Sequence, residues 1–265
     1  MDAVFLQTLD TTSWTGLSNL TVMAESRETR ASASETKFLV DPQMADQIRR
    51  WARANMEADP HGTGQYGDEY LTSSLYFDTP AFDVLRRRGS YGRAKYRIRR
   101  YSDLDFVFLE RKLRRPRLVA KRRTKVDLDE LAFLENAKAP EDWKGNWLRR
   151  RLEARGLKPV CQVSYHRTAR GVIEDGGPAR LTLDDSIRAH PIDGVRFNDE
   201  LGVAIAEPRL ILELKYRGYL PATFKRLIEE FSLSPAPASK YRYGMAAIGH
   251  VVPKGDPVRE SGVHA

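Results

Sequence analysis

The sequence predicts an α+β fold: a closed antiparallel β-barrel of about eight strands, with helices at its flanks. Charged residues recur at every second position in at least seven segments that read as strands, which places them on one face of each strand. Several of these strands are otherwise apolar, so their charged face must meet either solvent or a polar interior. If the sheet closes, that face lines the inside, where a barrel of about eight strands has room for side chains or one slim ligand.

Positive charge is concentrated in the segment from Arg86 to Lys125. This segment holds seventeen lysines and arginines against three acidic residues. Because the whole chain has 44 basic and 36 acidic residues, the remainder has 27 and 33, and the net charge of +8 is a local feature. Clustered like charges destabilise a compact state through self-repulsion. We therefore predict a functional site here, with a bound anion as the compensation.

The first strand of the basic segment covers residues 93–101, where basic residues alternate with Ala94, Tyr96 and Ile98. The ordinary interpretation of such a strand is a charged face in water and an apolar face on the core. Here the apolar face includes only one strong core residue, Ile98, which favours the functional interpretation.

Two further strands follow in the same segment, over residues 106–112 and 118–123. Each places a charged pair on one face, Glu110 with Lys112 and Lys121 with Arg123. Short turn-like connectors separate them, so the segment is predicted to form three adjacent antiparallel strands that contribute cations to one surface.

The remaining elements are assigned in chain order. Residues 35–40 form the first strand, and Asp41 then caps a helix that begins with Pro42. Residues 69–77 are the next strand, and a short helix through residues 82–85 leads into the basic segment.

After the basic segment, residues 127–155 are predicted to be helical. Strands then return, and each again carries polar or charged residues on one face: residues 159–167, 179–187 and 208–217. A last amphipathic helix opens at Pro221, and a Pro/Ala-rich linker over 234–238 follows it.

The chain is predicted to form one large domain between two tails. The three parts are a flexible N-terminal segment over residues 1–33, the barrel domain over 34–250 and a C-terminal tail over 251–265. No apolar run approaches the roughly 20 residues of a membrane span, and no secretory signal is visible. A single cysteine, Cys161, excludes a disulfide framework and fits a reducing, cytoplasmic compartment.

One glycine motif is discarded as a cofactor signal. Gly62, Gly64 and Gly67 match the dinucleotide-binding spacing, but they follow a predicted helix and precede a strand, which is the reverse of the required context. The sequence contains no Walker A motif, zinc-protease helix or nucleophile elbow. The basic strands also lack an exposed aromatic platform, since Tyr91, Tyr96 and Tyr101 do not share a face, so nucleic acid is not an expected partner.

The chain resembles the VTC-type polyphosphate polymerase domain of the triphosphate tunnel metalloenzyme (CYTH-like) superfamily. The resemblance spans roughly residues 35–248 and rests on several short motifs in order. They are Glu35-Thr36-Lys37, Ser74-Leu75-Tyr76-Phe77-Asp78-Thr79, Arg93-Ala94-Lys95-Tyr96-Arg97-Ile98-Arg99-Arg100-Tyr101, Leu109-Glu110-Arg111-Lys112, Tyr165-His166-Arg167-Thr168, Leu183-Asp184, Glu213-Leu214-Lys215 and Ser239-Lys240-Tyr241.

The resemblance implies a tunnel of antiparallel strands whose inward cations bind a triphosphate or polyphosphate, together with Mn²⁺ or Mg²⁺. The implied phosphate-binding residues are Lys37, Arg97, Arg99, Lys112, Lys121, Arg123, Arg167, Arg180, Lys215 and Lys240. Either Lys121 or Arg123 fills one family position. Glu213 is the implied metal ligand. Catalytic roles fall to Glu213, Lys215, Arg97 and Arg99, and supporting roles to Glu35, Glu110 and Tyr165.

One departure from the superfamily pattern bears on the reaction. The hydrolase and cyclase branch opens with Glu-x-Glu-x-Lys, whereas Ala33 stands at the first of those positions here. The shortened Glu-x-Lys form is that of the polymerase branch.

The expected activity is therefore an ATP-dependent polyphosphate polymerase that transfers the terminal phosphoryl group of ATP onto a polyphosphate chain. Two alternatives stay open: a metal-dependent inorganic triphosphatase or nucleotidase of the same fold, and a non-catalytic polyphosphate-binding module. The expected partners are ATP and inorganic triphosphate or polyphosphate. The sequence does not identify a membrane partner.

Overall fold

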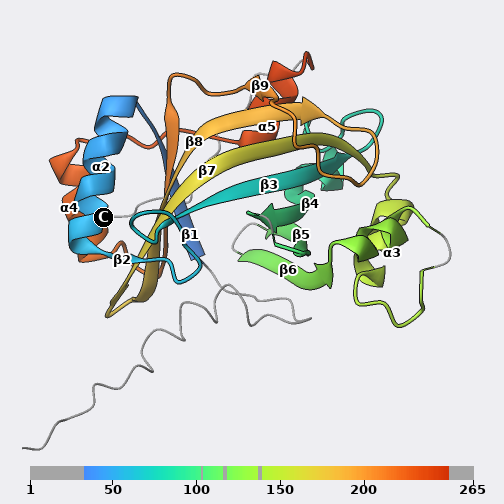
Figure 1. Cartoon of the computed structure of the whole chain (residues 1–265), viewed down its shortest axis with the longest axis horizontal. Helices are drawn as coiled ribbons and strands as arrows, with labels where there is room; N and C mark the ends of the chain where they lie inside the picture. Colours follow the sequence, from blue (N-terminus) through green and yellow to red (C-terminus); the bar gives the residue numbers. More distant parts are fainter. Residues whose placement is uncertain (1–32, 103, 116–117, 137–138, 251–265) are drawn as a thin grey trace, which may run out of the picture.

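The computed structural model describes residues 33–102, 104–115, 118–136 and 139–250 (Figure 1). Apart from Ala33, the two segments predicted to be tails, residues 1–33 and 251–265, lie outside this part of the chain. Within it, one antiparallel sheet forms the body of the molecule and helices pack around it, which confirms the α+β class. None of the helices described there has the length and apolar character needed to cross a membrane.

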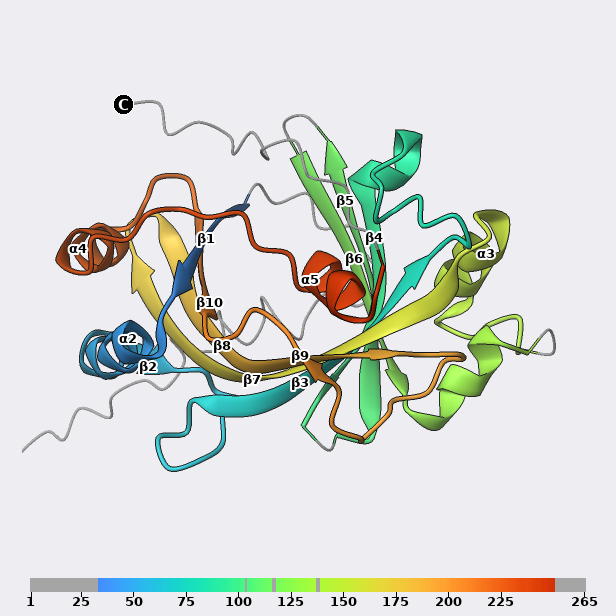
Figure 2. The same cartoon turned by 90° about the horizontal axis from the view of Figure 1, so that it is seen from above.

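Eight strands follow one another in the hydrogen-bonded order β1, β10, β8, β7, β3, β4, β5, β6. Their bounds are β1 Ala33–Val40, β3 Glu69–Asp78, β4 Ala94–Tyr101, β5 Phe106–Arg115, β6 Leu118–Asp127, β7 Lys158–Glu174, β8 Gly177–Pro191 and β10 Leu210–Arg217. Two short strands, β2 (Glu57–Ala58) and β9 (Val203–Ala204), pair with β7 and β8. The sheet curves so that its two end strands, β1 and β6, stand on opposite sides of one concave face (Figure 2).

Two apolar layers cover the convex side of the sheet. Helices α2 (Pro42–Asn55) and α4 (Ala222–Glu230) pack on β1, β10 and β8, around core residues such as Phe38 and Leu212. The 3-10 segment η3 (Asp129–Leu134) and helix α3 (Asn146–Ala154) pack on β4, β5 and β6. These layers bury the side chains of every second strand residue. The side chains of the alternate residues point to the concave side.

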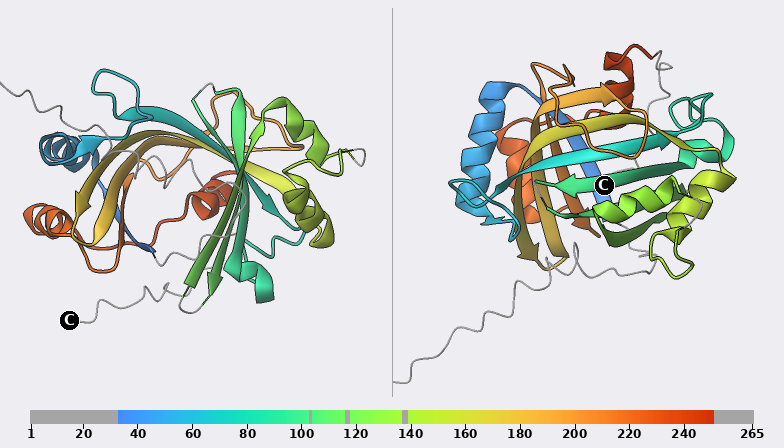
Figure 3. Two further views of the ribbon diagram at one scale, coloured as in Figure 1. Left: turned by 90° about the horizontal axis from the view of Figure 1, so that it is seen from below. Right: turned by 45° about the vertical axis from the view of Figure 1, so that its right-hand side comes forward.

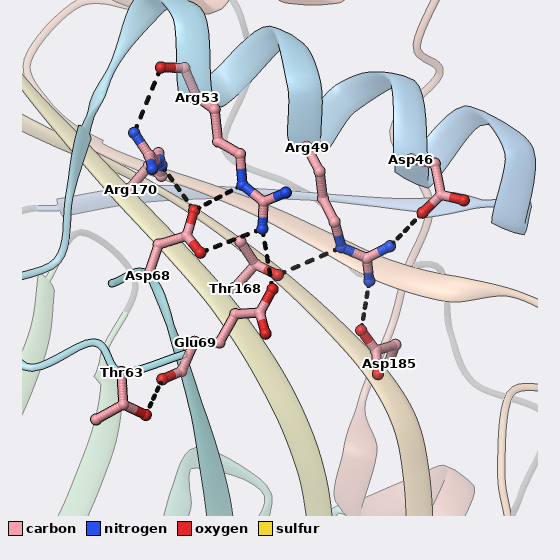
Figure 4. A network of polar contacts seen from close by, with 9 residues as sticks. All are labelled: Asp46, Arg49, Arg53, Thr63, Asp68, Glu69, Thr168, Arg170 and Asp185. Atoms are coloured by element: carbon pink, nitrogen blue, oxygen red, sulfur yellow. Dashed lines mark hydrogen bonds and ion pairs between the residues drawn. The ribbon is translucent and has the colours of Figure 1, made fainter. Parts of the chain in front are cut away.

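A polar network also fixes α2 to the sheet (Figure 4). Asp68 at the start of β3 is fully buried and accepts hydrogen bonds from Arg53 of α2, at 3.1 Å, and from Arg170 of β7, at 2.8 Å. Arg49 of α2 donates to Thr168 of β7 and pairs with Asp185 of β8. Asp41 starts the helix as predicted, by accepting the Met44 N–H, with Pro42 as the first helical residue.

Helix α5 (Lys240–Ala247) lies inside the curve of the sheet rather than on its outside (Figures 2 and 3). It packs on β7 and β8, and Gly244 makes the close approach possible. A Cβ at that position would lie 3.0 Å from Val163 and 3.2 Å from the Cys161 sulfur. The amphipathic helix at Pro221 was the last one predicted, and α5 was not, because this helix depends on contacts with distant strands.

Two predicted helices are wrong in part or in full. Among the described residues of 127–155, Asp127 ends β6 and helical structure is confined to η3 and α3; ahead of α3, the Asn146 amide donates to the Pro140 and Glu141 carbonyls. The short helix expected through residues 82–85 is a series of turns. Its Val84 and Leu85 N–H groups donate to the Asp78 carboxylate, at 2.8 and 2.9 Å, instead of to helical carbonyls.

Asp78 therefore ties three parts of the molecule together. Its fully buried carboxylate also accepts from the Thr79 N–H at 2.7 Å and from the Tyr241 hydroxyl of α5 at 2.5 Å. We expect Asp78→Ala to lower the free energy of unfolding by about 3 kcal/mol, because four buried donors lose a charged acceptor. Tyr241→Phe should cost about 1–2 kcal/mol, since it removes one of these hydrogen bonds.

Urea unfolding of the purified variants measures both effects. Asp142→Ala is the control, because this aspartate is exposed, and it should change the unfolding free energy by less than about 0.5 kcal/mol. An Asp78→Ala protein with wild-type stability would show that the carboxylate does not hold these segments together.

Candidate functional site

The strand register brings the predicted site residues to the concave side of the sheet, which we call the inner face. Residues directly opposite each other in neighbouring antiparallel strands share a face. Arg97 of β4 lies opposite Glu110 of β5, which lies opposite Arg123 of β6. Strands β4–β6 form one wall of the inner face, and β7, β8, β10 and β1 form the other. On this other wall, Lys37 of β1 lies opposite Glu213 of β10.

The other predicted residues follow the same alternation. Arg99, Lys112 and Lys121 are on the β4–β6 wall, and Arg180, Arg167, Tyr165, Glu35 and Lys215 are on the wall of β7, β8, β10 and β1. Lys240 reaches the same face from α5. The structure therefore gathers every site residue named from the sequence.

Glu110 is the centre of the β4–β6 wall. Its side chain is buried, and its oxygens lie 2.6 Å from Arg97 Nε, 2.9 Å from Lys121 Nζ and 3.2 Å from Arg123 Nε. Burial alone would raise the pKa of this carboxyl, but Arg97, Lys121 and Arg123 outweigh it and hold the pKa well below its ordinary value. Glu110 thus stays ionised and holds three cations, one of β4 and two of β6, in a fixed arrangement.

A second buried carboxylate organises the opposite wall. Asp184 of β8 accepts two hydrogen bonds from Arg167, at 2.6 and 2.8 Å, and its other contact is Lys240 Nζ at 2.5 Å. Burial opposes ionisation of this carboxyl, but Arg167 and Lys240 hold its pKa far below the ordinary value. The Lys240 ammonium also lies 4.7 Å from the centre of the Tyr165 ring. Tyr165 therefore supports the position of two phosphate-binding candidates.

The two walls meet through a third group of charges. Glu35 of β1 lies 3.0 Å from Lys37 and 3.0 Å from Lys112 of β5, so an ion pair connects strands near the two ends of the sheet. Lys37 is also 3.6 Å from Glu213. Burial would lower the Lys37 pKa, but Glu213 and Glu35 raise it above its ordinary value, so this lysine stays charged.

Polar residues that the sequence analysis missed complete the inner face. Arg180 donates to the Tyr70 hydroxyl at 2.6 Å and pairs with Asp59 at 2.5 Å. Arg99 donates to Ser74 at 3.1 Å. Tyr70, Ser74 and Asp59 carried no charge alternation in the sequence, so only the pairing of distant strands identifies them.

The carboxylates on the inner face fit a divalent metal. Glu213 and Glu35 both contact Lys37 and their side chains are about one-fifth exposed, at 20% and 22%. No group of three or more histidine, cysteine, aspartate or glutamate side chains with metal-ligand geometry occurs among the described residues. Mg²⁺ and Mn²⁺ favour oxygen ligands, and Mg²⁺ usually takes one or two carboxylates with water and substrate phosphates. Glu213, with Glu35 beside it, provides such a donor set.

Comparison with known proteins gives the family. The sequence matches the VTC domain over residues 32–248, which is most of the chain. The chain belongs to the VTC domain family. Among curated proteins, none matches it. The resemblance to the VTC domain noted in the sequence is therefore confirmed.

This VTC domain also resembles several solved structures. A putative adenylate cyclase from Bacillus halodurans is 19% identical, with 78% of this chain and 95% of that chain covered and a TM-score of 0.48. The PH1819 protein of Pyrococcus horikoshii OT3 is 16% identical, with coverages of 82% and 97% and a TM-score of 0.42. A putative adenylyl cyclase from Hippeastrum, described as having a dominant triphosphatase activity, is 16% identical, with coverages of 86% and 98% and a TM-score of 0.42.

Two lysines of the VTC domain have unusually low pKa values. Lys95 is exposed as a residue and its ammonium donates to the Ser239 hydroxyl at 3.3 Å; desolvation together with Lys37 and Lys112 lowers its pKa to about 7. Desolvation lowers the pKa of Lys121 to about 8, where Arg123 and Lys215 add to the effect and Glu110 opposes it. In the free protein, both lysines therefore lose their protons over a range in which ordinary lysines stay charged.

We expect this titration to make anion binding depend on pH. A bound phosphate chain favours the charged lysines, so tripolyphosphate affinity should fall between pH 7 and 9, by up to about tenfold per pH unit for each lysine. The free protein should become more stable as pH rises from about 7 towards 10, because the unfolded chain still binds the protons that the folded chain has released.

Calorimetric titration with tripolyphosphate at pH 7, 8 and 9 measures the first effect. The Lys95→Arg/Lys121→Arg double variant is the control, because arginine stays charged throughout this range, and its affinity should change far less. An equal fall in the double variant would assign the pH dependence to other groups.

Proposed function

We propose that this VTC domain is an ATP-dependent polyphosphate polymerase, which transfers the terminal phosphoryl group of ATP onto a polyphosphate chain held along its inner face. The observation that carries the proposal is the extent of the cationic surface. The ten predicted phosphate-binding lysines and arginines come from seven strands and one helix. The carboxylates that pair with them, Glu35, Asp59, Glu110, Asp184 and Glu213, are fewer than these cations, which leaves a positive excess for an anionic chain.

The residue types suit phosphoryl transfer. This reaction needs alignment and charge neutralisation more than covalent help from protein groups. Arginine can bind phosphate through two parallel hydrogen bonds, and lysine acts as a point charge. A divalent ion held by Glu213 would neutralise charge on the transferred phosphoryl group. Arg97 and Arg99 on one wall and Lys215 on the other would then hold the phosphates in line.

The β1 strand favours transfer over hydrolysis. It begins at Ala33, which lies opposite Arg217, so β1 supplies Glu35 to the inner face but no second carboxylate before it. The hydrolase and cyclase branch of the superfamily has a glutamate at that position. A polymerase, by contrast, must retain its product next to ATP, which requires cations beyond the reacting phosphates.

The direct test is incubation of the purified protein with ATP and Mn²⁺, followed by gel separation of polyphosphate by length. We expect a ladder of long chains with ADP as the co-product. Arg97→Ala and Lys215→Ala should both lose the ladder, whereas Arg150→Ala, on the exposed side of α3, should retain it. Release of orthophosphate without a ladder would favour the triphosphatase alternative.

The metal assignment has its own test. Glu213→Gln should reduce turnover by at least about 100-fold, because a bound metal contributes several kcal/mol to stabilisation of the transition state. Tripolyphosphate binding without metal should change little, since the lysines and arginines remain. Glu229→Gln, an exposed substitution on α4, is the control. Unchanged turnover of Glu213→Gln at saturating Mn²⁺ would exclude this glutamate as the ligand.

A further inference from the structure

One end of the inner face carries a group of aromatic rings. Tyr70, Tyr101, Phe108 and Phe106 form a continuous chain of edge contacts, with ring centroids 5.5, 5.8 and 5.6 Å apart in that order. The alternation of β4 and β5 places these rings on the same face as the phosphate-binding candidates. This group was not predicted from the sequence, because its rings come from three strands whose pairing no local pattern shows.

The two ends of the inner face differ in composition along three neighbouring strands. From the aromatic end, β4 presents Tyr101, Arg99, Arg97 and Lys95; β5 presents Phe106, Phe108, Glu110 and Lys112; and β6 presents Asp127, Lys125, Arg123 and Lys121. The aromatic rings of β4 and β5 therefore lie together at one end, beside Asp127 and Lys125 of β6, and Lys95, Lys112 and Lys121 lie at the other. A face that bound only linear phosphate would not need this difference between its ends.

The four rings are not equivalent. Tyr70 and Phe108 are buried, at 7% exposure each. Tyr70 packs against Tyr101, and Phe108 packs against both Tyr101 and Phe106. Phe106 and Tyr101 are only partly buried. The ammonium of the exposed Lys125 lies 3.7 Å from the Phe106 ring centroid, and the exposed Asp127 lies opposite Phe106 in the strand pairing. Phe106 is thus a partly exposed ring, with the Lys125 ammonium over its face and Asp127 opposite it.

The chemistry of this end matches a nucleoside and not a phosphate. The face of an aromatic ring carries negative charge density, so it attracts Lys125 and repels phosphate oxygens. Any nucleobase can stack on such a ring, because every base has a π-face whatever hydrogen-bonding groups it carries. Arg123 lies next along the face, with its guanidinium carbon 3.5 Å from the Phe108 ring centroid, where it can meet the first phosphates.

We propose that the aromatic end binds the base of a nucleoside triphosphate, stacked on Phe106 beside Tyr101, so that the phosphates extend towards Arg123, Arg99 and Arg97. This inference rests on the proposed function, because it assigns an orientation to the ATP of that reaction. It adds that the base is recognised by stacking, so nucleotides with different bases should bind with similar affinity.

The test compares ATP with tripolyphosphate, which has the phosphates but no base. Calorimetric titrations are made on the full-length protein and on the Phe106→Ala and Phe106→Leu variants. Phe106→Leu retains apolar volume and removes only the ring. In both variants we expect ATP affinity to fall by about 5- to 150-fold, the range of base–aromatic stacking, while tripolyphosphate affinity stays within about twofold of wild type. Tyr219→Ala is the control, because Tyr219 is 93% exposed.

Each other outcome overturns the proposal. An equal loss for ATP and tripolyphosphate would give Phe106 a structural role, and unchanged ATP affinity would place the base elsewhere. If wild-type protein binds neither compound, the proposed function fails as well. If it binds tripolyphosphate and makes polyphosphate while the variants keep wild-type ATP affinity, only the orientation is wrong. Retained tripolyphosphate binding in the same samples also demonstrates that the variants are folded.

Discussion

At least ten lysines and arginines share one concave face, and their mutual repulsion is the constraint on which the rest of the molecule depends. Two buried carboxylates offset it. Glu110 joins Arg97, Lys121 and Arg123 across β4, β5 and β6, and Asp184 joins Arg167 with Lys240 of α5. Removing one partner of a buried charge group leaves the others uncompensated, at a cost of several kcal/mol. These carboxylates thus organise the cations while leaving a positive excess for an anion.

The apolar layers on the convex side do the complementary work. Strands that carry cations inward present residues such as Ile98, Leu109, Leu212 and Leu214 outward, and each of these is fully buried against helices or loops. Burial of such side chains contributes about 1.5–3 kcal/mol each, which opposes the repulsion inside. The two faces of the sheet therefore differ in role: the convex face contributes most of the apolar burial, and the concave face carries the cations that an anion would bind.

Helix α5 connects these two tasks. Asp78 fixes it through Tyr241, and Tyr241 also stacks on Tyr76 of β3, with ring centroids 5.2 Å apart. The preceding linker donates the Ala236 N–H to the Lys37 carbonyl and accepts the Lys37 ammonium at Ala238. The end of the domain thus holds Lys240 in the site and lies beside the strand that carries Glu35 and Lys37. Loss of the packing that holds α5 would therefore also remove Lys240 from the site.

The sequence by itself determined which residues face inward. Alternation in β1, β4, β5, β6 and β10 has a period of two, and this local property assigns Lys37, Arg97, Lys112, Lys121 and Lys215 to one face without any knowledge of strand order. It also predicted the antiparallel α+β architecture, and the ordered motifs predicted the family. Single elements that rely on local signals, such as α2 with its Asp41 cap, were predicted as well.

Only the tertiary structure decided what those residues meet. The Glu35–Lys112 contact joins positions 77 residues apart, and the Asp78–Tyr241 contact joins positions 163 residues apart, so no local pattern contains them. The same is true of the aromatic end, where Tyr70 and Tyr101 come together because β3 pairs with β4 in one particular register. Helix α5 lacks a strong pattern of its own and forms where Gly244 can approach Cys161 and Val163. Pairing register and sheet curvature are long-range properties, and they determine which charges are neighbours.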